Sequence, residues 1–341
     1  MTRAQARQEL LDSTGWSCAS SVPLVDDASS RRYERLTRTG SGDSVVLMDA
    51  PPDLGNDTAP FLRIAKHLSA LGLSAPEVLA ADQTAGYLLL EDLGDALFAR
   101  LMDDDPTQES TLYLAATDLL LELHRHPAPE GLPPLGPEQM AEATDLALLW
   151  YATGCGRDAT QEEVELCKEI VRDALVGLAA ETPVLALRDF HAENLIWLPE
   201  RTGPARVGLL DFQDAFAGPR AYDLISLLED ARRDVPPDIR AAMIAHYIER
   251  AGCDTAAFRT ACAVLGAQRN LRILGIFARL SMQYGKPHYV AFIPRVWRLL
   301  QGDLAHPSLT RLSDFLADTL PEPTRDRLER IRRLCATYPT P

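Results

Sequence analysis

The chain has 341 residues, of which 46% are hydrophobic and 24% charged, and this composition is typical of an ordinary folded protein. Its length suits one large enzyme of two lobes or two modest domains. With 34 Lys+Arg against 49 Asp+Glu the formal net charge is -15, which disfavours nucleic acid and anionic membranes as partners.

The first ninety residues alternate between short β-like runs and two amphipathic helices. The later helix is the clearer of the two, because Phe61, Ile64, Ala65 and Leu68 share one face and Gly72 follows as a stop signal. The expected helices are residues 2–13 and 58–71, and the expected strands are residues 20–25, 32–38, 44–48, 78–81 and 87–90.

From residue 96 onward the pattern is mainly helical. A Pro-rich connection over 127–137 separates a buried helix from the helices that follow it. We interpret Trp150 and Tyr151 as core residues, with stacking on a substrate ring as the alternative. Residues 268–272 are interpreted as helix with solvated arginines, with contact to an acceptor as the alternative. The expected helices are residues 112–124, 140–151 and 162–180, followed by several helices between residue 236 and the end.

The six cysteines are scattered, without metal-ligand spacing, and therefore indicate reduced thiols rather than disulfides. The start of the chain lacks the apolar core of a signal peptide. No uncharged run approaches the roughly 20 apolar residues that a spanning helix needs. We therefore expect a cytoplasmic protein without a membrane partner.

Two apolar runs that each end in a carboxylate carry the strongest chemical signal. The first leads to Asp189, with Asn194 five residues later, and the second leads to Asp211-Phe212. This is the spacing of a kinase catalytic loop and its metal-binding segment, except that Gln213 replaces the usual glycine. Phosphoryl transfer needs one carboxylate to orient the acceptor hydroxyl, and a second carboxylate and an amide oxygen to hold Mg²⁺.

The alternative is that Asp189 and Asp211 only end two buried strands, with Asn194 as a cap, since Asp and Asn favour such positions. The runs 184–187 and 195–198 suggest short strands flanking a loop, and this context favours the catalytic interpretation. We therefore predict Asp189 as the catalytic residue, and Asn194 and Asp211 as the metal ligands.

The segments from Arg188 and from Val207, with Ala221-Tyr222-Asp223-Leu224, resemble the aminoglycoside phosphotransferase superfamily of small-molecule kinases. These segments and residues 46–52 are most similar to the anomeric kinases of N-acetylmuramate and N-acetylglucosamine, and the similarity is strongest from 184 to 236. The family places Asp223 as a structural brace of the catalytic loop.

This resemblance implies a bilobal, protein-kinase-like α+β fold, with a small antiparallel-sheet lobe and a larger, mainly helical lobe. Residues 1–93 would form the nucleotide-binding lobe and residues 94–341 the catalytic and sugar-binding lobe. The implied substrates are ATP with Mg²⁺ and an amino sugar, and the protein is expected to be a monomer. The alternatives are an aminoglycoside or choline-type kinase, and a binding module without catalytic activity.

The resemblance also implies the residues that contact the nucleotide. The turn of residues 28–32 would lie over the phosphates, with contacts from Ser30, Arg31 and Arg32, although a plain polar hairpin is the alternative. The segment with Glu91 and Leu93 resembles the hinge that meets the adenine, with a buried strand end as the alternative. Met48 stands where kinases carry the phosphate-binding Lys, so Arg31 or Arg32 is expected to replace that charge.

Overall fold

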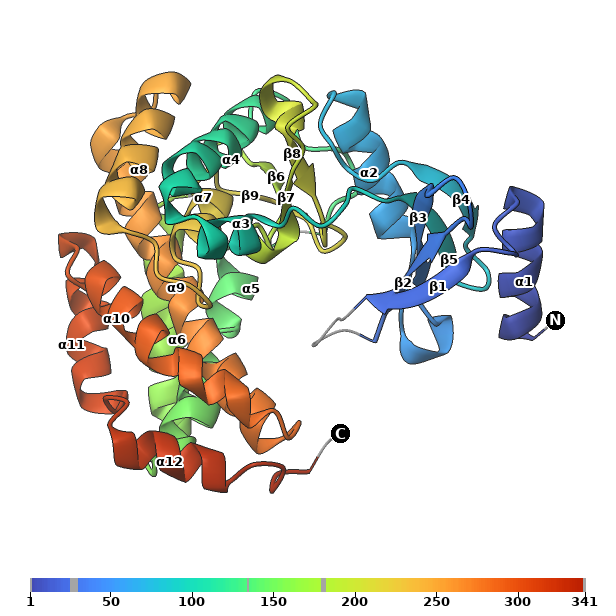
Figure 1. The fold of residues 1–341 in the computed structure, drawn as a ribbon. Helices are drawn as coiled ribbons and strands as arrows, with labels where there is room; N and C mark the ends of the chain where they lie inside the picture. Colours follow the sequence, from blue (N-terminus) through green and yellow to red (C-terminus); the bar gives the residue numbers. More distant parts are fainter. Residues whose placement is uncertain (1, 25–29, 134, 179–181, 340–341) are drawn as a thin grey trace. The chain divides into compact units, whose positions relative to one another are not determined.

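The computed structural model describes residues 2–24, 30–133, 135–178 and 182–339 (Figure 1). The strands are β1 (Ser20–Leu24), β2 (Arg32–Thr37), β3 (Ser44–Asp49), β4 (Val78–Asp82), β5 (Tyr87–Glu91), β6 (Val184–Ala186), β7 (Leu195–Trp197), β8 (Val207–Leu209) and β9 (Phe216–Gly218). The helices are α1 (Arg3–Thr14), α2 (Ala59–Ala70), α3 (Phe98–Asp104), α4 (Glu109–Leu123), α5 (Pro137–Glu142), α6 (Gln161–Val176), α7 (Ala221–Leu228), α8 (Pro237–Ala251), α9 (Thr255–Met282), α10 (Ile293–Leu304), α11 (Thr310–Thr319) and α12 (Arg325–Arg333).

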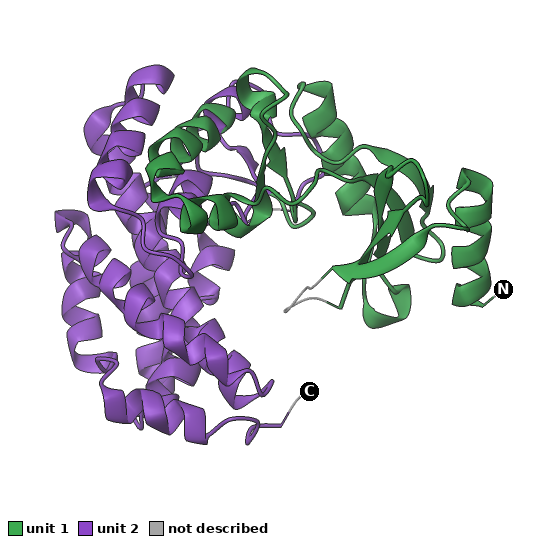
Figure 2. Cartoon of the chain, viewed as in Figure 1, with its two compact units in different colours: residues 1–119, 192–215 green, residues 120–191, 216–341 purple. Residues whose placement is uncertain are grey.

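The chain divides into two compact units (Figure 2). Unit 1 contains residues 1–119 and 192–215, and unit 2 contains residues 120–191 and 216–341. Unit 1 holds a five-stranded sheet and unit 2 is mainly helical, so the predicted combination of a small sheet with a larger helical part is confirmed. The predicted lobe boundary after residue 93 stays a prediction.

The sheet of unit 1 is antiparallel throughout and has the order β1-β2-β3-β5-β4. Because side chains alternate along a strand, the register separates two faces. Leu36 of β2 lies opposite Val45 of β3, and both face the buried cluster that contains α1. Met48 of β3 lies opposite Tyr33 and Leu88, and it belongs to the other face. Met48 is only 1% exposed.

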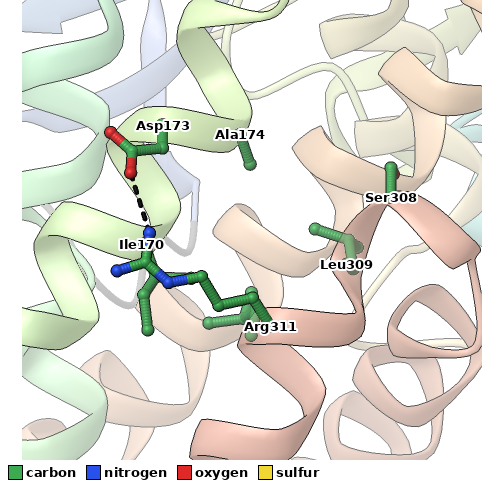
Figure 3. A pocket seen from close by; sticks show the side chains of 7 residues that line it. Ile170, Asp173, Ala174, Ser308, Leu309 and Arg311 are labelled. Atoms are coloured by element: carbon green, nitrogen blue, oxygen red, sulfur yellow. Dashed lines mark hydrogen bonds and ion pairs between the residues drawn. The ribbon is translucent and has the colours of Figure 1, made fainter.

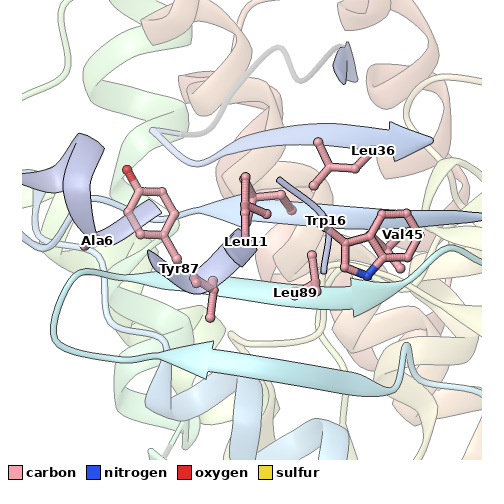
Figure 4. Packing of buried hydrophobic residues seen from close by; sticks show 9 residues of the cluster. Ala6, Leu11, Trp16, Leu36, Val45, Tyr87 and Leu89 are labelled. Carbon is pink, nitrogen blue, oxygen red and sulfur yellow. The ribbon is translucent and has the colours of Figure 1, made fainter. Parts of the chain in front are cut away.

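Helix α1 covers one face of this sheet, as the amphipathic pattern of residues 2–13 predicted. A capping box at Thr2 satisfies the first free N–H groups of the helix. Leu11 and Trp16 pack against Leu36 and Leu89 of the sheet (Figure 4). Burial of this apolar surface fixes the N-terminal helix on the strands.

Helix α2 confirms the pattern found in residues 58–71. Its four predicted core residues are all buried, and the chain leaves the helix through Gly72, whose φ of 74° suits a residue without a side chain. The segment between α2 and β4 also holds the β7–β8 hairpin, because the Ser74 hydroxyl donates to the Ala205 carbonyl over 2.6 Å. A second contact comes from the Leu209 N–H, which donates to the Ser74 carbonyl over 2.8 Å.

One of the helices predicted in unit 2 is interrupted in the structure. The helix expected over residues 140–151 is broken: α5 ends at Glu142, and residues 147–152 form a π-helical turn. Gly275 of α9 explains the irregular path, because an added Cβ there would lie 2.2 Å from the Leu146 backbone carbon. The two backbones approach so closely that packing overrides the regular helix. The predicted helix 162–180 corresponds to α6, and its residues 179–180 lie outside the described residues.

The predicted strands 184–187 and 195–198 exist in shorter form, and each pairs with a partner from later in the chain. Strand β6 pairs with β9 within unit 2, and β7 pairs with β8 within unit 1. All four strands have only three residues. They place a loop at the end of each short ladder, and those loops carry the predicted site residues.

A buried polar cluster joins α7, α9 and α10 inside unit 2. Asn270 donates through Nδ2 to Glu229 over 2.8 Å and to Asp303 over 2.9 Å. Arg240 forms an ion pair with Glu229, and its Nη2 atom lies 3.4 Å from the Asp303 Oδ1 atom. Burial, with the negative charge of Glu229 beside it, raises the pKa of Asp303 to about 9.

Helices long and apolar enough to cross a bilayer are not found among the residues that the structure describes.

Candidate active site

Asp189 follows β6 in a tight turn whose centre is Arg188. The Asp189 N–H donates to the Leu187 carbonyl over 2.9 Å, and Arg188 between them has a φ of 73°. A three-residue turn with a central residue at this φ is rare and strained for an L-residue. Backbone strain of this kind gathers at functional sites, because the surrounding structure has to hold it in place.

Asp223 of α7 holds the same turn through two hydrogen bonds. Its buried carboxylate accepts hydrogen bonds from the Leu187 N–H over 2.6 Å and from the Arg188 N–H over 3.0 Å. These contacts confirm the structural role that was predicted for Asp223. Burial raises the pKa of Asp223 to about 7, and the two backbone donors act in the opposite direction.

His191 lies two residues after Asp189 and is uncharged at neutral pH. Burial lowers the pKa of His191 to about 3, and the positive charge of Arg232 acts in the same direction. The Arg232 Nη1 atom lies 3.5 Å from the His191 Nε2 atom.

Asn194 and Asp211 come together at one end of the β7–β8 ladder in unit 1. Leu195 lies opposite Leu209 in the register, and the Leu210 N–H donates to the Asn194 carbonyl over 3.0 Å. Asp211 is the next residue. The two predicted metal ligands therefore stand at the same end of the two strands.

The segment after β8 presents Asp211 to solvent and buries its neighbours. Asp211 has a φ of 55° and an exposed side chain, whereas Phe212 and Gln213 are buried. Gln213 donates through Nε2 to the Asp211 Oδ1 atom over 2.7 Å. Phe212 stacks on Phe61 of α2, with ring centroids 4.8 Å apart. The hydrogen bond from Gln213 and the packing of Phe212 hold the segment that carries Asp211.

The unit boundary between residues 191 and 192 lies between the predicted catalytic residue and the predicted metal ligands. Asp189 belongs to unit 2, and Asn194 and Asp211 belong to unit 1. The structure brings the two predicted ligands together within one unit, and Asp189 precedes Asn194 by five residues of chain.

The predicted phosphate turn is described only in part, since Ala28 and Ser29 lie outside the described residues. The Ser30 hydroxyl donates to the Asn56 Oδ1 atom over 3.0 Å. Arg31 precedes β2, and Arg32 is the first residue of that strand, opposite Asp49. By strand alternation Arg32 shares the face that α1 covers and not the face of Met48, so the register favours Arg31 as the phosphate contact.

The two predicted hinge residues have structural contacts. Glu91 ends β5, and its carboxylate forms an ion pair with Arg201 over 2.5 Å and accepts the Glu77 N–H over 3.2 Å. Leu93 is 8% exposed and lies against Gly208, where an added Cβ would be 3.0 Å from the Leu93 Cδ1 atom. Their contact with adenine stays a prediction.

Sequence reasoning missed an ion-pair cluster beside this hinge. Arg35 of β2 pairs with Asp92 over 2.6 Å and with Asp95 over 2.8 Å. Burial raises the pKa of Asp92, but the hydrogen bonds from Arg35, Ser44 and the Gly94 N–H together outweigh burial and hold that pKa below its usual range. The acidic turn after β5 was visible in the sequence, but its partner lies 57 residues away from Asp92.

Both members of the usual kinase ion pair are absent from the corresponding elements. Kinases pair a Lys on the third strand with a Glu on the following helix. Here β3 carries Met48 at that place, and α2 has the basic residues Arg63 and Lys66 but no carboxylate among its 12 residues. The two absences are consistent with each other, because no lysine on β3 and no carboxylate on α2 is left without its partner.

A surface depression of about 230 Å³ lies elsewhere in unit 2 (Figure 3). Ile170 and Asp173 of α6 line one side, and Arg311 of α11 lines the other. The Arg311 guanidinium already pairs with Asp173 over 2.9 Å and with Glu169 over 2.8 Å. None of the predicted site residues line this depression, and the charged side chains that line it are already paired with one another.

Comparison with known proteins finds relatives that match nearly the whole chain. The chain is 40% identical to an N-acetylmuramate/N-acetylglucosamine kinase of Caulobacter vibrioides, over 95% of this chain and 98% of that protein. It is 34% identical to a protein of the same name from Pseudomonas aeruginosa, over 92% of this chain and 93% of that protein.

Among solved structures, the choline kinase LicA from Streptococcus pneumoniae is similar with a TM-score of 0.58 at 13% identity. The similarity covers 92% of this chain and 99% of that chain, and it confirms the predicted kinase-like fold. A family model described as the phosphotransferase enzyme family matches residues 21–259, which include all the predicted site residues. The chain belongs to the phosphotransferase enzyme family.

Proposed function

We propose that this phosphotransferase moves the γ-phosphoryl group of ATP to the anomeric C1 hydroxyl of N-acetylmuramate, N-acetylglucosamine or both, as a step of peptidoglycan recycling. The observation that carries the proposal is the 40% identity to a kinase named for these two sugars, over nearly the whole of both chains. A second relative with the same name supports the same assignment.

Asp189 is the group that orients the acceptor hydroxyl and takes its proton. The strained turn at Arg188 and the brace from Asp223 support this role, because a catalytic group needs a fixed direction. The anomeric hydroxyl belongs to a hemiacetal and is more acidic than an ordinary sugar alcohol. The Asp189 carboxylate therefore only has to orient this hydroxyl and accept its proton late in the transfer.

Asn194 and Asp211 are the residues that would hold Mg²⁺. One amide oxygen and one exposed carboxylate fit this ion, which prefers oxygen ligands and keeps several waters. The hydrogen bond from Gln213 to Asp211 supports the assignment, since ligating carboxylates are held by neighbouring donors. When bound, the ion neutralises charge on the phosphates of the nucleotide.

Nucleotide contacts are assigned to Ser30 and Arg31 at the phosphates and to the backbone near Glu91 and Leu93 at the adenine. Arg32 is the weaker candidate because of its place in the strand register. The proposed enzyme acts as a monomer in the cytoplasm, where ATP is available. Light scattering at micromolar protein concentration tests the monomer.

The proposed acceptor is tested by offering free N-acetylmuramate, free N-acetylglucosamine, their methyl glycosides, choline and kanamycin, and by locating the product phosphate with ³¹P NMR. We expect 1-phosphates from the free sugars and no product from the methyl glycosides, because the methyl group blocks the acceptor oxygen. Phosphorylation of a methyl glycoside would contradict the anomeric position. A preference for kanamycin or choline would assign the chain to another substrate class of the same family.

A further inference from the structure

Arg269 of α9 is a buried guanidinium inside unit 2. It is 6% exposed, although the sequence favoured solvated arginines in this helix. The Arg269 Nη2 atom donates to the Ser226 hydroxyl of α7 over 2.7 Å. The guanidinium also lies over the Tyr222 ring, 5.7 Å from its centroid. Burying a charge is costly, and the carboxyl groups of Asp223 and Asp230 lie near enough to interact with this one. The hydrogen bond to Ser226 fixes the direction of the guanidinium.

The Ser226 hydroxyl continues the chain of hydrogen bonds toward the catalytic turn. Its Oγ atom lies 3.3 Å from the Arg188 carbonyl oxygen. A hydroxyl carries one proton, and the guanidinium can only donate. Ser226 therefore accepts from Arg269 and gives its own proton to the Arg188 carbonyl. A charged donor strengthens such a chain of hydrogen bonds.

The Arg188 carbonyl belongs to the same planar peptide unit as the Asp189 N–H. Asp223 holds the N–H side of Arg188, and Ser226 holds the carbonyl side. Two residues of α7 therefore hold the peptide planes on both sides of Arg188, whose strained φ is 73°. The second plane sets the direction in which the Asp189 side chain leaves the backbone.

We infer that Ser226 and Arg269 are positioning residues for phosphoryl transfer: through the Arg188 carbonyl they hold the peptide plane that aims Asp189 at the acceptor hydroxyl. This inference rests on the proposed role of Asp189. Asp223 does not reach the second plane, which the Asp189 N–H holds on one side through the Leu187 carbonyl and Ser226 holds on the other.

The test compares Ser226→Ala, Arg269→Met and the double variant with a matched control, Gln268→Met. Gln268 is the neighbour of Arg269, is equally buried, and donates to the Met140 carbonyl over 2.7 Å instead of to the catalytic turn. Misplacing a catalytic group by about 1 Å costs on the order of 10²-fold in rate. We expect kcat per folded molecule to fall about 10- to 100-fold in both single variants, with KM for ATP and sugar nearly unchanged.

Because both residues act in one chain, the double variant should lose no more than Ser226→Ala alone. Arg269→Lys, which keeps a charged donor, should recover part of kcat. Gln268→Met should lower the melting temperature and leave kcat unchanged. If Arg269→Met does not fold, Ser226→Ala carries the test, since it removes a single oxygen atom.

Hydrogen exchange of the peptide that covers residues 187–190 separates this inference from the role of Asp189. Without substrate, exchange should be faster in Ser226→Ala and Arg269→Met, and unchanged in Gln268→Met. If Asp189→Asn kept full turnover, the proposed catalytic role would fail while this exchange difference remained. Normal kcat in both variants, independent losses in the double variant, or an equal loss of kcat in Gln268→Met would each overturn the inference.

Discussion

Gln213 offers a test of the metal site, because it stands where kinases carry glycine and its amide contacts the proposed ligand Asp211. The perturbation is Gln213→Leu, which keeps the approximate size of the side chain and removes the donor. The Nε2 to Oδ1 distance of 2.7 Å is that of a hydrogen bond to a charged group.

Two routes give the size of the effect. A hydrogen bond to a charged group is worth about 1.5–3 kcal/mol, and the exposure of Asp211 favours the lower part of that range. Loss of a group that orients a metal ligand lowers metal affinity about 10- to 100-fold. This corresponds to about 1.4–2.7 kcal/mol, in agreement with the first value.

Thermal stability should move much less than metal affinity. The Gln213 side chain is 6% exposed, and its Oε1 atom is buried without a hydrogen-bond partner in the described part of the chain. The substitution removes the unsatisfied Oε1 acceptor, which stabilises the fold, and the Nε2 donor, whose loss destabilises it. The two effects on the free energy of unfolding therefore oppose each other.

The assay is isothermal titration of Mg²⁺ into the protein saturated with ATP, together with a melting curve for each protein. Gln283→Leu is the matched control, because Gln283 also donates through its side chain, to the Pro339 carbonyl over 2.7 Å, and is not in the proposed site. Equal Mg²⁺ affinity in Gln213→Leu and the native protein would refute the reasoning.

Three further predictions follow from the site and the core. Asp189→Asn should still bind ATP and lose about 10²–10⁴-fold in kcat; near-native turnover would remove Asp189 from its role. Arg31→Ala should raise KM for ATP, whereas Arg32→Ala should change it little; a larger effect at Arg32 would contradict the strand register. The raised pKa of Asp303 means that the folded state holds a proton that the unfolded state loses above pH ~4. The free energy of unfolding should therefore fall as pH rises toward 9, by at most about 1.4 kcal/mol per unit. Asp303→Asn should reduce this dependence of the free energy of unfolding on pH, measured by urea titrations at several pH values. An unchanged dependence would contradict a proton held by Asp303 in the folded state.

The sequence predicted those features whose causes are local. The apolar face of α2 depends on residues within a few turns of one another, and its four predicted core residues are buried. The spacing from Asp189 to Asn194 and the later Asp211 are equally local, which is why the candidate site was readable before the structure.

The features that the sequence did not predict depend on distant partners. The break between α5 and the π-helical turn follows from the approach of Gly275, more than a hundred residues away. The pairing of β6 with β9 and the buried contact of Arg269 with Ser226 are also set by tertiary packing. Burial of Arg269 reversed the expectation of solvated arginines, because a charged residue in a helical pattern gives no sign of a buried hydroxyl acceptor.

The absence of the Lys–Glu pair has a consequence for control of the enzyme. Kinases that depend on this pair can be switched off when the helix moves and the pair breaks. Here Met48 is buried, and α2 offers no carboxylate, so a lysine introduced at this position would be an unpaired buried charge that costs several kcal/mol. A single substitution cannot restore the pair, and a switch that works by breaking it has nothing to act on.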